Sequence, residues 1–204
     1  MEYRWENIQN IGSRPYTCGY CSNPLSSERG FRARLHQNNG SDAGIHAYVY
    51  VCHFCGKPSF FDVINGIQTP GPKYGNEIPG IEDEKINKLY DEARKCIGTG
   101  APTSAILACR KLLMHIAIEK GAPENLKFIE YVEYLSTKGY IPPDSKEWVD
   151  EIREKGNEAT HEIVIMSDTD AKDLLQLTEM LLKIIYQFPA EIKKKREKKV
   201  PDIK

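Results

Sequence analysis

The chain has 204 residues, of which 40% are hydrophobic and 28% charged, proportions typical of a globular protein and not of a disordered one. That length is sufficient for one domain of moderate size and a second, small one. The formal net charge of -1 at pH 7 excludes attraction of nucleic acid by the charge of the whole chain, so any such contact requires a local basic patch.

The sequence contains no apolar run that approaches the roughly 20 residues needed to cross a bilayer. Residues 1–10 are polar and charged, without the apolar centre of a signal peptide. We therefore expect no membrane association and a cytoplasmic location. Because disulfides rarely persist in that reducing compartment, closely spaced cysteines indicate a metal site first.

Two Cys-x-x-Cys pairs lie in the first third of the chain and contain Cys18, Cys21, Cys52 and Cys55. The spacing lets two thiolates from one tight turn reach the same tetrahedral ion. Gly19 and Gly56 are expected to supply the relaxed backbone that such turns need. The pattern predicts a structural Zn²⁺ site, because four thiolates leave no open position for a catalytic water. His53, inside the second pair, is then expected to face solvent.

Residues 31–36 and 45–51, between the cysteine pairs, are rich in aromatic and β-branched side chains, and the turn-forming stretch 38–42 separates them. This pattern predicts a small β zinc ribbon over residues 1–64. A unit of that size buries too little apolar surface to fold unaided. Binding of the ion, worth on the order of 10 kcal/mol, is therefore expected to stabilise it.

A basic cluster lies on the first of these strands, where Arg29, Arg32, Arg34 and His36 flank Phe31. Such a cluster can meet a phosphate backbone or stack on a base. Alternating basic residues also occur on strands that only face solvent. Arg32 and Arg34 are therefore candidate binding residues, and an ordinary solvated strand face is the alternative.

Prolines and glycines crowd residues 65–80, which predicts a linker without a regular element. A helical bundle is predicted over residues 81–190, which makes the whole chain an α+β protein. The candidate helices are residues 82–96, 103–120, 126–137, 146–161 and 171–188. The last has a wide apolar surface, typical either of a central helix in one bundle or of a helix that also packs against a partner subunit.

Residues 191–204 are expected to form a basic tail, in which lysine and arginine dominate positions 193–199. A tail of this kind can hold RNA or DNA by its charge. The alternative is a solvated, frayed helix end, which is common for a charge run at a chain terminus.

The fourth candidate helix carries an unusual row of polar side chains. Arg153, Asn157 and His161 follow at four-residue steps, which places a cation, an amide and a titratable imidazole on one helix face. Gly156 costs about 1 kcal/mol relative to alanine inside a helix and suggests close approach of a backbone or ligand. Arg110, on the second helix, is expected to face this row. The alternative is that these side chains join helices to one another.

Two segments resemble the bacterial domain-of-unknown-function family 4145: Ala108-Cys109-Arg110-Lys111-Leu112-Leu113, and Trp148-Val149-Asp150-Glu151-Ile152-Arg153 with Gly156-Asn157-Glu158-Ala159-Thr160-His161-Glu162. The resemblance covers about residues 68–188, and ribbons like the one before it are often attached to such domains. The family in turn resembles the HEPN superfamily of helical bundles, which are usually dimeric and frequent in bacterial toxins and antiviral defence. A homodimer is therefore implied.

Many HEPN proteins are metal-independent ribonucleases whose motif is an arginine, a polar residue and, a few positions later, a histidine. Asn157 and His161 match the polar and histidine positions, but Gly156 stands in place of the arginine. The resemblance therefore implies, as our leading hypothesis, a module that binds RNA or a partner protein without turnover, in a defence or toxin-antitoxin system. The alternative is an endoribonuclease in which Arg153 supplies the missing cation and His161 the acid or base.

Overall fold

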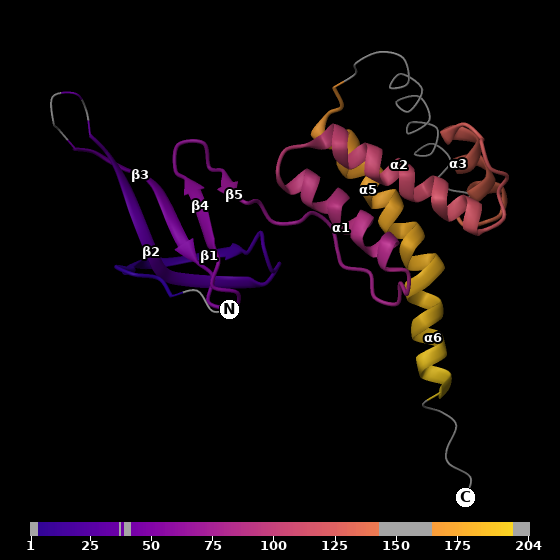
Figure 1. The fold of residues 1–204 in the computed structure, drawn as a ribbon, viewed down its shortest axis with the longest axis horizontal. Helices are drawn as coiled ribbons and strands as arrows, with labels where there is room; N and C mark the ends of the chain where they lie inside the picture. The colour runs from indigo at the N-terminus through magenta and orange to yellow at the C-terminus, as the bar shows by residue number, and fades with distance from the viewer. Residues whose placement is uncertain (1–3, 37, 39–41, 143–164, 198–204) are drawn as a thin grey trace, which may run out of the picture. The chain divides into compact units, whose positions relative to one another are not determined.

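The computed structural model describes residues 4–36, 38, 42–142 and 165–197, and the chain forms two compact units, Met1–Lys73 and Tyr74–Lys204 (Figure 1). The first is a β-sheet and the second is helical, which confirms the predicted α+β class. The stretch expected to be a linker, residues 65–80, is divided between the two units. Each unit has its own hydrophobic core.

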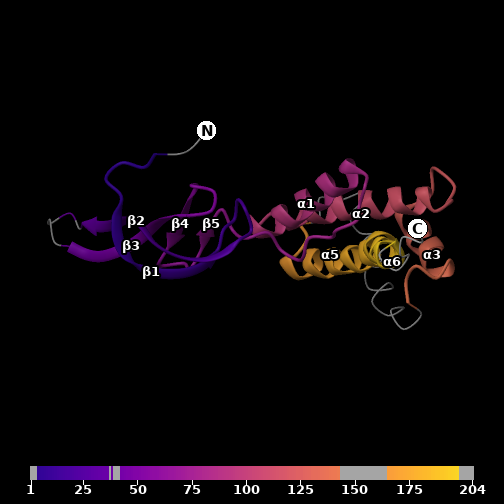
Figure 2. The ribbon, with the colours of Figure 1, turned by 90° about the horizontal axis from the view of Figure 1, so that it is seen from below.

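The first unit is an antiparallel sheet with strand order β1-β2-β3-β4-β5 (Figures 1 and 2). Its strands are β1 (Gln9–Thr17), β2 (Pro24–His36), β3 (Asp42–Val51), β4 (Pro58–Asp62) and β5 (Gln68–Thr69). The sequence pattern predicts only the central pair, β2 and β3. It misses β1 because Ile11 alone among that strand's side chains is fully buried, and β5 because only two residues of the breaker-rich stretch join the sheet.

One face of the sheet carries a small aromatic core. The Tyr50 and Phe61 rings lie edge to face with centroids 5.7 Å apart, and the Tyr16 ring lies 5.1 Å from Phe61. The guanidinium of Arg14 lies 4.4 Å from the centre of the Phe61 ring. Ring pairs and cation–π contacts of this kind each stabilise a fold by about 1 kcal/mol. So small a core leaves the sheet dependent on further support.

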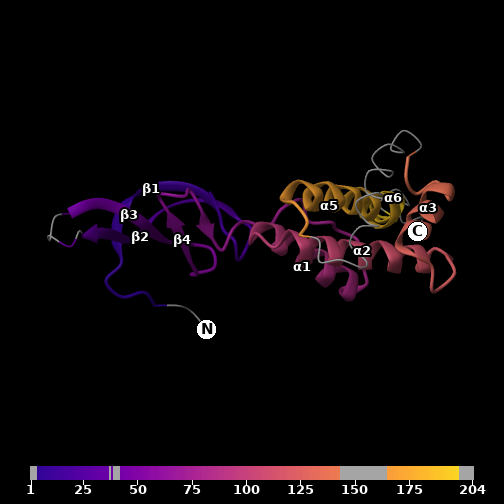
Figure 3. The same ribbon diagram turned by 90° about the horizontal axis from the view of Figure 1, so that it is seen from above.

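The second unit contains α1 (Glu84–Gly98), α2 (Pro102–Glu119), α3 (Phe128–Thr137) and α5 (Asp168–Leu182), which continues through the π-helix η2 (Lys183–Gln187) into α6 (Phe188–Glu197). Figures 2 and 3 show α5 facing the layer formed by α1 and α2. Helix α2 packs against α1, α3 and α5 and is the centre of this core. The first three predicted helices are confirmed, with shifted ends; the fourth, residues 146–161, lies outside the described residues.

The last helix is longer than the sequence predicts. At its start, the Ser167 hydroxyl accepts a hydrogen bond from the Asp170 N–H at 3.1 Å and donates one to the Asp170 carboxylate at 2.6 Å. The predicted end at residue 188 is wrong, because the wider π turn of η2 leaves room for the ring of Pro189, which has no N–H to donate. The buried leucines of α5, which favour the central-helix interpretation for this part, are Leu174, Leu175, Leu177, Leu181 and Leu182.

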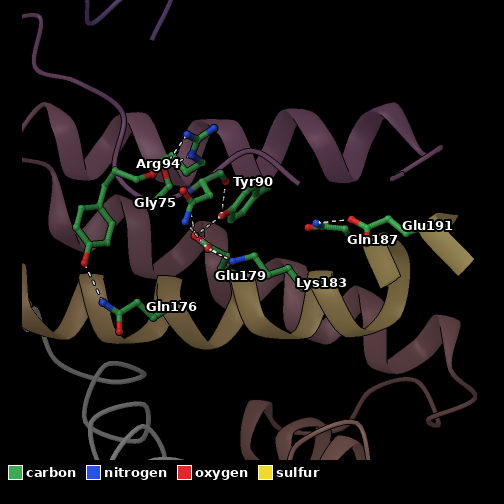
Figure 4. Close-up of polar contacts among 10 residues, drawn as sticks. Gly75, Tyr90, Arg94, Gln176, Glu179, Lys183, Gln187 and Glu191 are labelled. Atoms are coloured by element: carbon green, nitrogen blue, oxygen red, sulfur yellow. Dashed lines mark hydrogen bonds and ion pairs between the residues drawn. The ribbon is translucent and has the colours of Figure 1, made fainter. Parts of the chain in front are cut away.

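A buried carboxylate on α5 holds the first residues of the second unit against the bundle (Figure 4). Glu179 is 8% exposed and accepts hydrogen bonds from the Asn76 backbone N–H at 2.9 Å and from the Asn76 side chain at 2.8 Å. The Tyr90 hydroxyl lies 3.1 Å and the Lys183 ammonium 2.5 Å from the same carboxylate. Burial by itself raises the pKa of Glu179, but the hydrogen bonds from Lys183 and Asn76 lower it to about 2.

Arg94 on α1 also holds this segment, residues 74–76, which we call the strap. It donates to the carbonyl of Tyr74 at 2.8 Å and to that of Gly75 at 2.9 Å. Gly75 has a φ of +69°, and a Cβ added there would lie 2.7 Å from the Glu179 carboxylate. Part of the stretch that the sequence assigns to a linker is therefore packed into the helical unit, because its backbone satisfies two buried charges.

We predict that Glu179→Gln lowers the free energy of unfolding of the helical unit by roughly 2–3 kcal/mol at neutral pH, because the buried donors lose their charged acceptor. The carboxyl has a pKa of about 2 in the folded chain and about 4.3 when unfolded, so its contribution is present above about pH 4.3 and is lost as the pH falls toward 2. Denaturant unfolding followed by helical circular dichroism should show this deficit shrinking with acidification.

The matched control is Glu191→Gln, because Glu191 is an exposed carboxylate on α6 that accepts a hydrogen bond from Gln187 at 2.8 Å. This change is expected to alter the free energy of unfolding by less than about 0.5 kcal/mol. A deficit of Glu179→Gln that stays the same at every pH would contradict the charged role of Glu179.

Candidate functional site

Two similar turns, one after β1 and one after β3, bring the four cysteines together. In the first, the Ser22 N–H donates to the Cys18 carbonyl at 2.9 Å; in the second, the Gly56 N–H donates to the Cys52 carbonyl at 2.8 Å. The backbone is left-handed at the same position of both turns, with φ of +59° at Ser22 and +70° at Gly56. The predicted role of Gly56 is thereby confirmed.

Gly19 has a different role from the one predicted. A Cβ at this position would lie 2.3 Å from the Pro70 carbonyl oxygen and 2.6 Å from that of Gly71. Glycine is therefore required by the close approach of the chain that follows β5, and not by a relaxed turn conformation. The sequence did not reveal this, because the two segments meet only in the folded sheet.

The sulfur atoms have the geometry of a metal site. The Sγ atoms of Cys18 and Cys55 lie 3.8 Å apart, as do those of Cys21 and Cys52, and all four lie within 4.8 Å of one another. A tetrahedral ion with metal–sulfur bonds of about 2.3 Å has sulfurs about 3.8 Å apart. A disulfide requires about 2.05 Å, and none is formed. The predicted four-cysteine site is confirmed as a group that could hold a metal ion.

The protonation of these thiols differs from one to another. Burial raises the pKa of Cys18 to about 12, and burial also raises that of Cys55. For Cys21, burial acts in the same direction, but hydrogen bonds from the backbone and side chain of Asn23 outweigh it and lower the pKa to about 7. An ion that binds here therefore displaces protons from thiols that would otherwise keep them at neutral pH.

A tyrosine lies beside the cluster. Tyr16 packs against the small core that contains Cys18, Leu25 and Cys52. Burial raises the pKa of the Tyr16 hydroxyl, the neighbouring Cys52, Cys18 and Cys55 raise it further, and the Ser59 hydroxyl lowers it. Negative charge on the sulfurs therefore disfavours ionisation of this tyrosine.

A hollow of about 830 Å³ adjoins the second cysteine turn. Its lining includes the N-terminal segment and the middle of β2, and its most distinctive side chains are Arg4, Trp5, Arg29, His53 and Phe54. His53 is exposed, as expected, and its ring centre lies 4.4 Å from that of Phe54. Trp5 and Phe54 are not among the residues that the sequence predicts for a site. The signal available for Phe54 was its position between the two cysteines of a polar turn.

The predicted binding residues lie in separate places. Arg32 and Arg34 are exposed on β2, opposite Tyr48 and Ile45 of β3, and do not line the hollow. Arg110 belongs to the helical unit, where its guanidinium lies 4.6 Å from the centre of the Phe128 ring and burial lowers its pKa. Its observed contact thus joins α2 to α3.

The predicted catalytic residues Arg153, Asn157 and His161 lie outside the described residues, and so does any contact between them and Arg110. In the helical unit, burial raises the pKa of the Cys109 thiol to about 12 and also raises that of Cys96, so both thiols are expected to be unreactive.

None of the helices that the structure describes combines the length and the apolar character of a bilayer span.

Comparison with known proteins identifies only the helical part of the chain. The family model described as "Domain of unknown function (DUF4145)" matches residues 91–201, which is more than half of the 204 residues. No curated protein and no solved structure matches the chain. The expected relation to the HEPN superfamily therefore stays a prediction.

We predict that Cys52→Ser, or removal of the metal with a chelator, unfolds the first unit and leaves the helical unit folded. The first unit has only small buried clusters, whereas the helical unit has a large core of its own. Amide chemical-shift dispersion of the strand residues should collapse while helical circular dichroism persists, and metal analysis should find one ion per chain before the change and none after it.

Cys96→Ser is the matched control, because Cys96 is a half-buried thiol on α1, outside the cluster. It should keep the full metal content and the strand signals. Retention of a stoichiometric ion and of the strand signals by Cys52→Ser would contradict the assignment of Cys52 as a ligand.

Proposed function

Since the chain belongs to the DUF4145 family, whose function is unknown, we propose that its metal-held sheet binds single-stranded RNA and performs no chemistry on it. One observation carries the proposal: β2 presents two exposed arginines, Arg32 and Arg34, on one face of an otherwise small unit. Guanidinium groups along a strand suit the phosphates of a nucleic acid that lies across it.

The distribution of charge supports the same proposal. Residues 1–73 contain seven lysines and arginines against five aspartates and glutamates, although the whole chain has a formal net charge of -1. Five of those seven are arginines. The sheet unit therefore has a small net positive charge, whereas the second unit has a net negative charge despite its basic run at residues 193–199.

We infer that the ion is Zn²⁺ and that its role is structural. Zinc has no geometric preference of its own and accepts a closed tetrahedral set of four thiolates, Cys18, Cys21, Cys52 and Cys55. With four protein ligands there is no open position for water, so the ion would supply folding free energy and not catalysis. Metal analysis of the purified chain identifies the element.

The ribonuclease alternative, with Arg153 and His161 on RNA, stays a prediction from the sequence. It differs from the present proposal in one observable: an enzyme shortens the RNA that it binds. The RNA used for the binding measurements below should therefore be recovered intact after incubation with the metal-loaded chain in a buffer without added divalent ions, since the expected enzyme is metal-independent and a chelator would unfold the sheet.

We also propose that two copies pair through the last helix. Met180, Ile184 and Phe188 line a hollow of about 350 Å³ on α5, η2 and α6, where Phe188 is 48% exposed, and Ile192 follows one turn later at 51%. The first turn of α5 is acidic and the last turn of α6 is basic. An antiparallel pair of these helices therefore places opposite charges side by side, which favours a second copy as the occupant.

We predict that alanine at both Arg32 and Arg34 weakens binding of an unstructured oligouridine and lowers the slope of log K against log salt by about 1.4, because each lost single-strand phosphate contact removes about 0.7. Fluorescence anisotropy over a salt series measures both quantities. Lys193→Ala with Lys194→Ala on α6 is the control and should keep the wild-type slope. If the α6 variant loses the slope and the β2 variant keeps it, the RNA lies on the basic tail and not on the sheet.

We predict that Phe188→Asp shifts the chain from dimer to monomer in sedimentation equilibrium, because a carboxylate would be buried without a partner in the helix pair. Leu107→Asp, on an exposed position of α2, is the control and should leave the mass unchanged. A wild-type chain that is monomeric at all concentrations would refute the pairing.

A further inference from the structure

The hollow beside the second cysteine turn has walls from two segments that are distant in the sequence. One wall is the N-terminal segment, which is held by a hydrogen bond from the Trp5 indole to the Gly56 carbonyl at 2.7 Å. The Trp5 ring also lies 6.2 Å from that of Phe31 on β2. The other wall is the metal turn itself, from Cys52 to Gly56. An ion held by Cys52 and Cys55 would therefore also fix one wall of the hollow.

Phe54 is the side chain in this hollow that most needs an explanation. It is 58% exposed at the tip of the turn, where its only ring contact among the described residues is with His53. A large apolar side chain held in water by a rigid turn contributes nothing to the core of the sheet. Its flat ring is available to stack on a planar ligand, as aromatic side chains of single-strand binding proteins do.

Two arginines also line this hollow. Arg4 and Arg29 are both exposed, and neither has an ion-pair partner within the described part of the chain. Glu28 also lies at the rim and is engaged by the Asn10 side-chain amide at 3.3 Å. An anion that approaches the two guanidinium groups would therefore meet unpaired donors, and Glu28 offers an acceptor for an amino or hydroxyl group of the ligand.

A flat stacking surface, two unpaired guanidinium groups and one carboxylate acceptor together match the parts of a nucleotide. The volume, about 830 Å³, lies within the range of about 300–1,000 Å³ typical of small-ligand pockets. Arg29 lies on the same face of β2 as Phe31, which contacts Trp5, whereas Arg32 and Arg34 lie on the opposite face, beside Tyr48 and Tyr50. The strand order leaves β2 without a β1 partner beyond Gly30, so this part of β2 is an edge of the sheet. A strand of RNA that enters the hollow can thus continue over this edge of the sheet.

We propose that this hollow accepts one unpaired nucleotide of a single-stranded RNA, with its base stacked on Phe54 and its phosphate on Arg4 and Arg29. This inference rests on the proposed RNA binding of the sheet and adds the site at which a base is read. Because the turn that carries Phe54 is closed by the metal ligands Cys52 and Cys55, the inference includes that base recognition is lost with the ion.

The test compares the intact, metal-loaded chain with Phe54→Ala, using the same oligouridine. The variant is expected to bind roughly 10-fold more weakly or worse, the usual cost of losing one stacked base, with an unchanged salt slope because phenylalanine carries no charge. Phe54→Trp, which keeps a stacking surface, should restore binding. Arg29→Ala should weaken binding and lower the salt slope by about 0.7.

Phe60→Ala is the matched control, because Phe60 is a 42% exposed phenylalanine on β4 outside the hollow. It should bind RNA as the wild type does, and all variants should keep one ion per chain. A second probe is an oligouridine with abasic positions, which has no base to stack on Phe54. Wild type and Phe54→Ala should bind this probe with the same affinity.

The outcomes separate this inference from the proposed function. If Phe54→Ala and Arg29→Ala bind as tightly as wild type while the double change at Arg32 and Arg34 reduces the salt slope, RNA binding stands and the nucleotide site is refuted. If the wild-type chain binds no RNA, both are refuted. If Phe60→Ala weakens binding as much as Phe54→Ala, the stacking site is not this hollow.

Discussion

The first unit depends on the convergence of four sulfur atoms at a single point. Cys18 and Cys21 lie in a tight turn directly after β1, and Cys52 and Cys55 lie in a second tight turn directly after β3. The positions of the sulfurs therefore also determine where these two strands end. Other segments are attached to the same turns: the Trp5 indole bonds to the carbonyl of Gly56, and the chain after β5 passes close to Gly19. An ion held by these sulfurs would give a small unit with little apolar core the stability that larger domains obtain from burial.

The second unit is held in a different way. Its core is apolar and large, and the buried polar residues within it include Glu179, whose oxygens accept hydrogen bonds from Asn76, Tyr90 and Lys183. A buried carboxylate is tolerated when its lone pairs have donors, and here the donors come from the segment before α1, from α1 and from η2. The same interaction therefore specifies how the first residues of the unit lie on the bundle. Loss of the metal and loss of this carboxylate consequently affect different halves of the chain.

The proposed function follows the same division. The sheet unit has a net positive charge, and the exposed Phe54 ring and the hollow lie at its second cysteine turn. The helical unit has the family match and, on its last helix, an apolar surface with complementary charge at its two ends. In the proposed protein the sheet contacts RNA, and the bundle brings two such sheets into one assembly, which would raise the affinity for a strand long enough to reach both.

Local spacing in the sequence was enough to predict the four-cysteine site, the central strand pair and the first three helices. Each of these depends on residues a few positions apart, within one turn or one helix face. Glu179, Trp5 and the close approach of Pro70 to Gly19 were not predictable, because their partners are distant along the chain. Only folding brings a buried carboxylate to its donors, or two aromatic rings and two arginines to one hollow. The spacing of residues along a helix or strand cannot predict contacts between segments that are distant in the sequence.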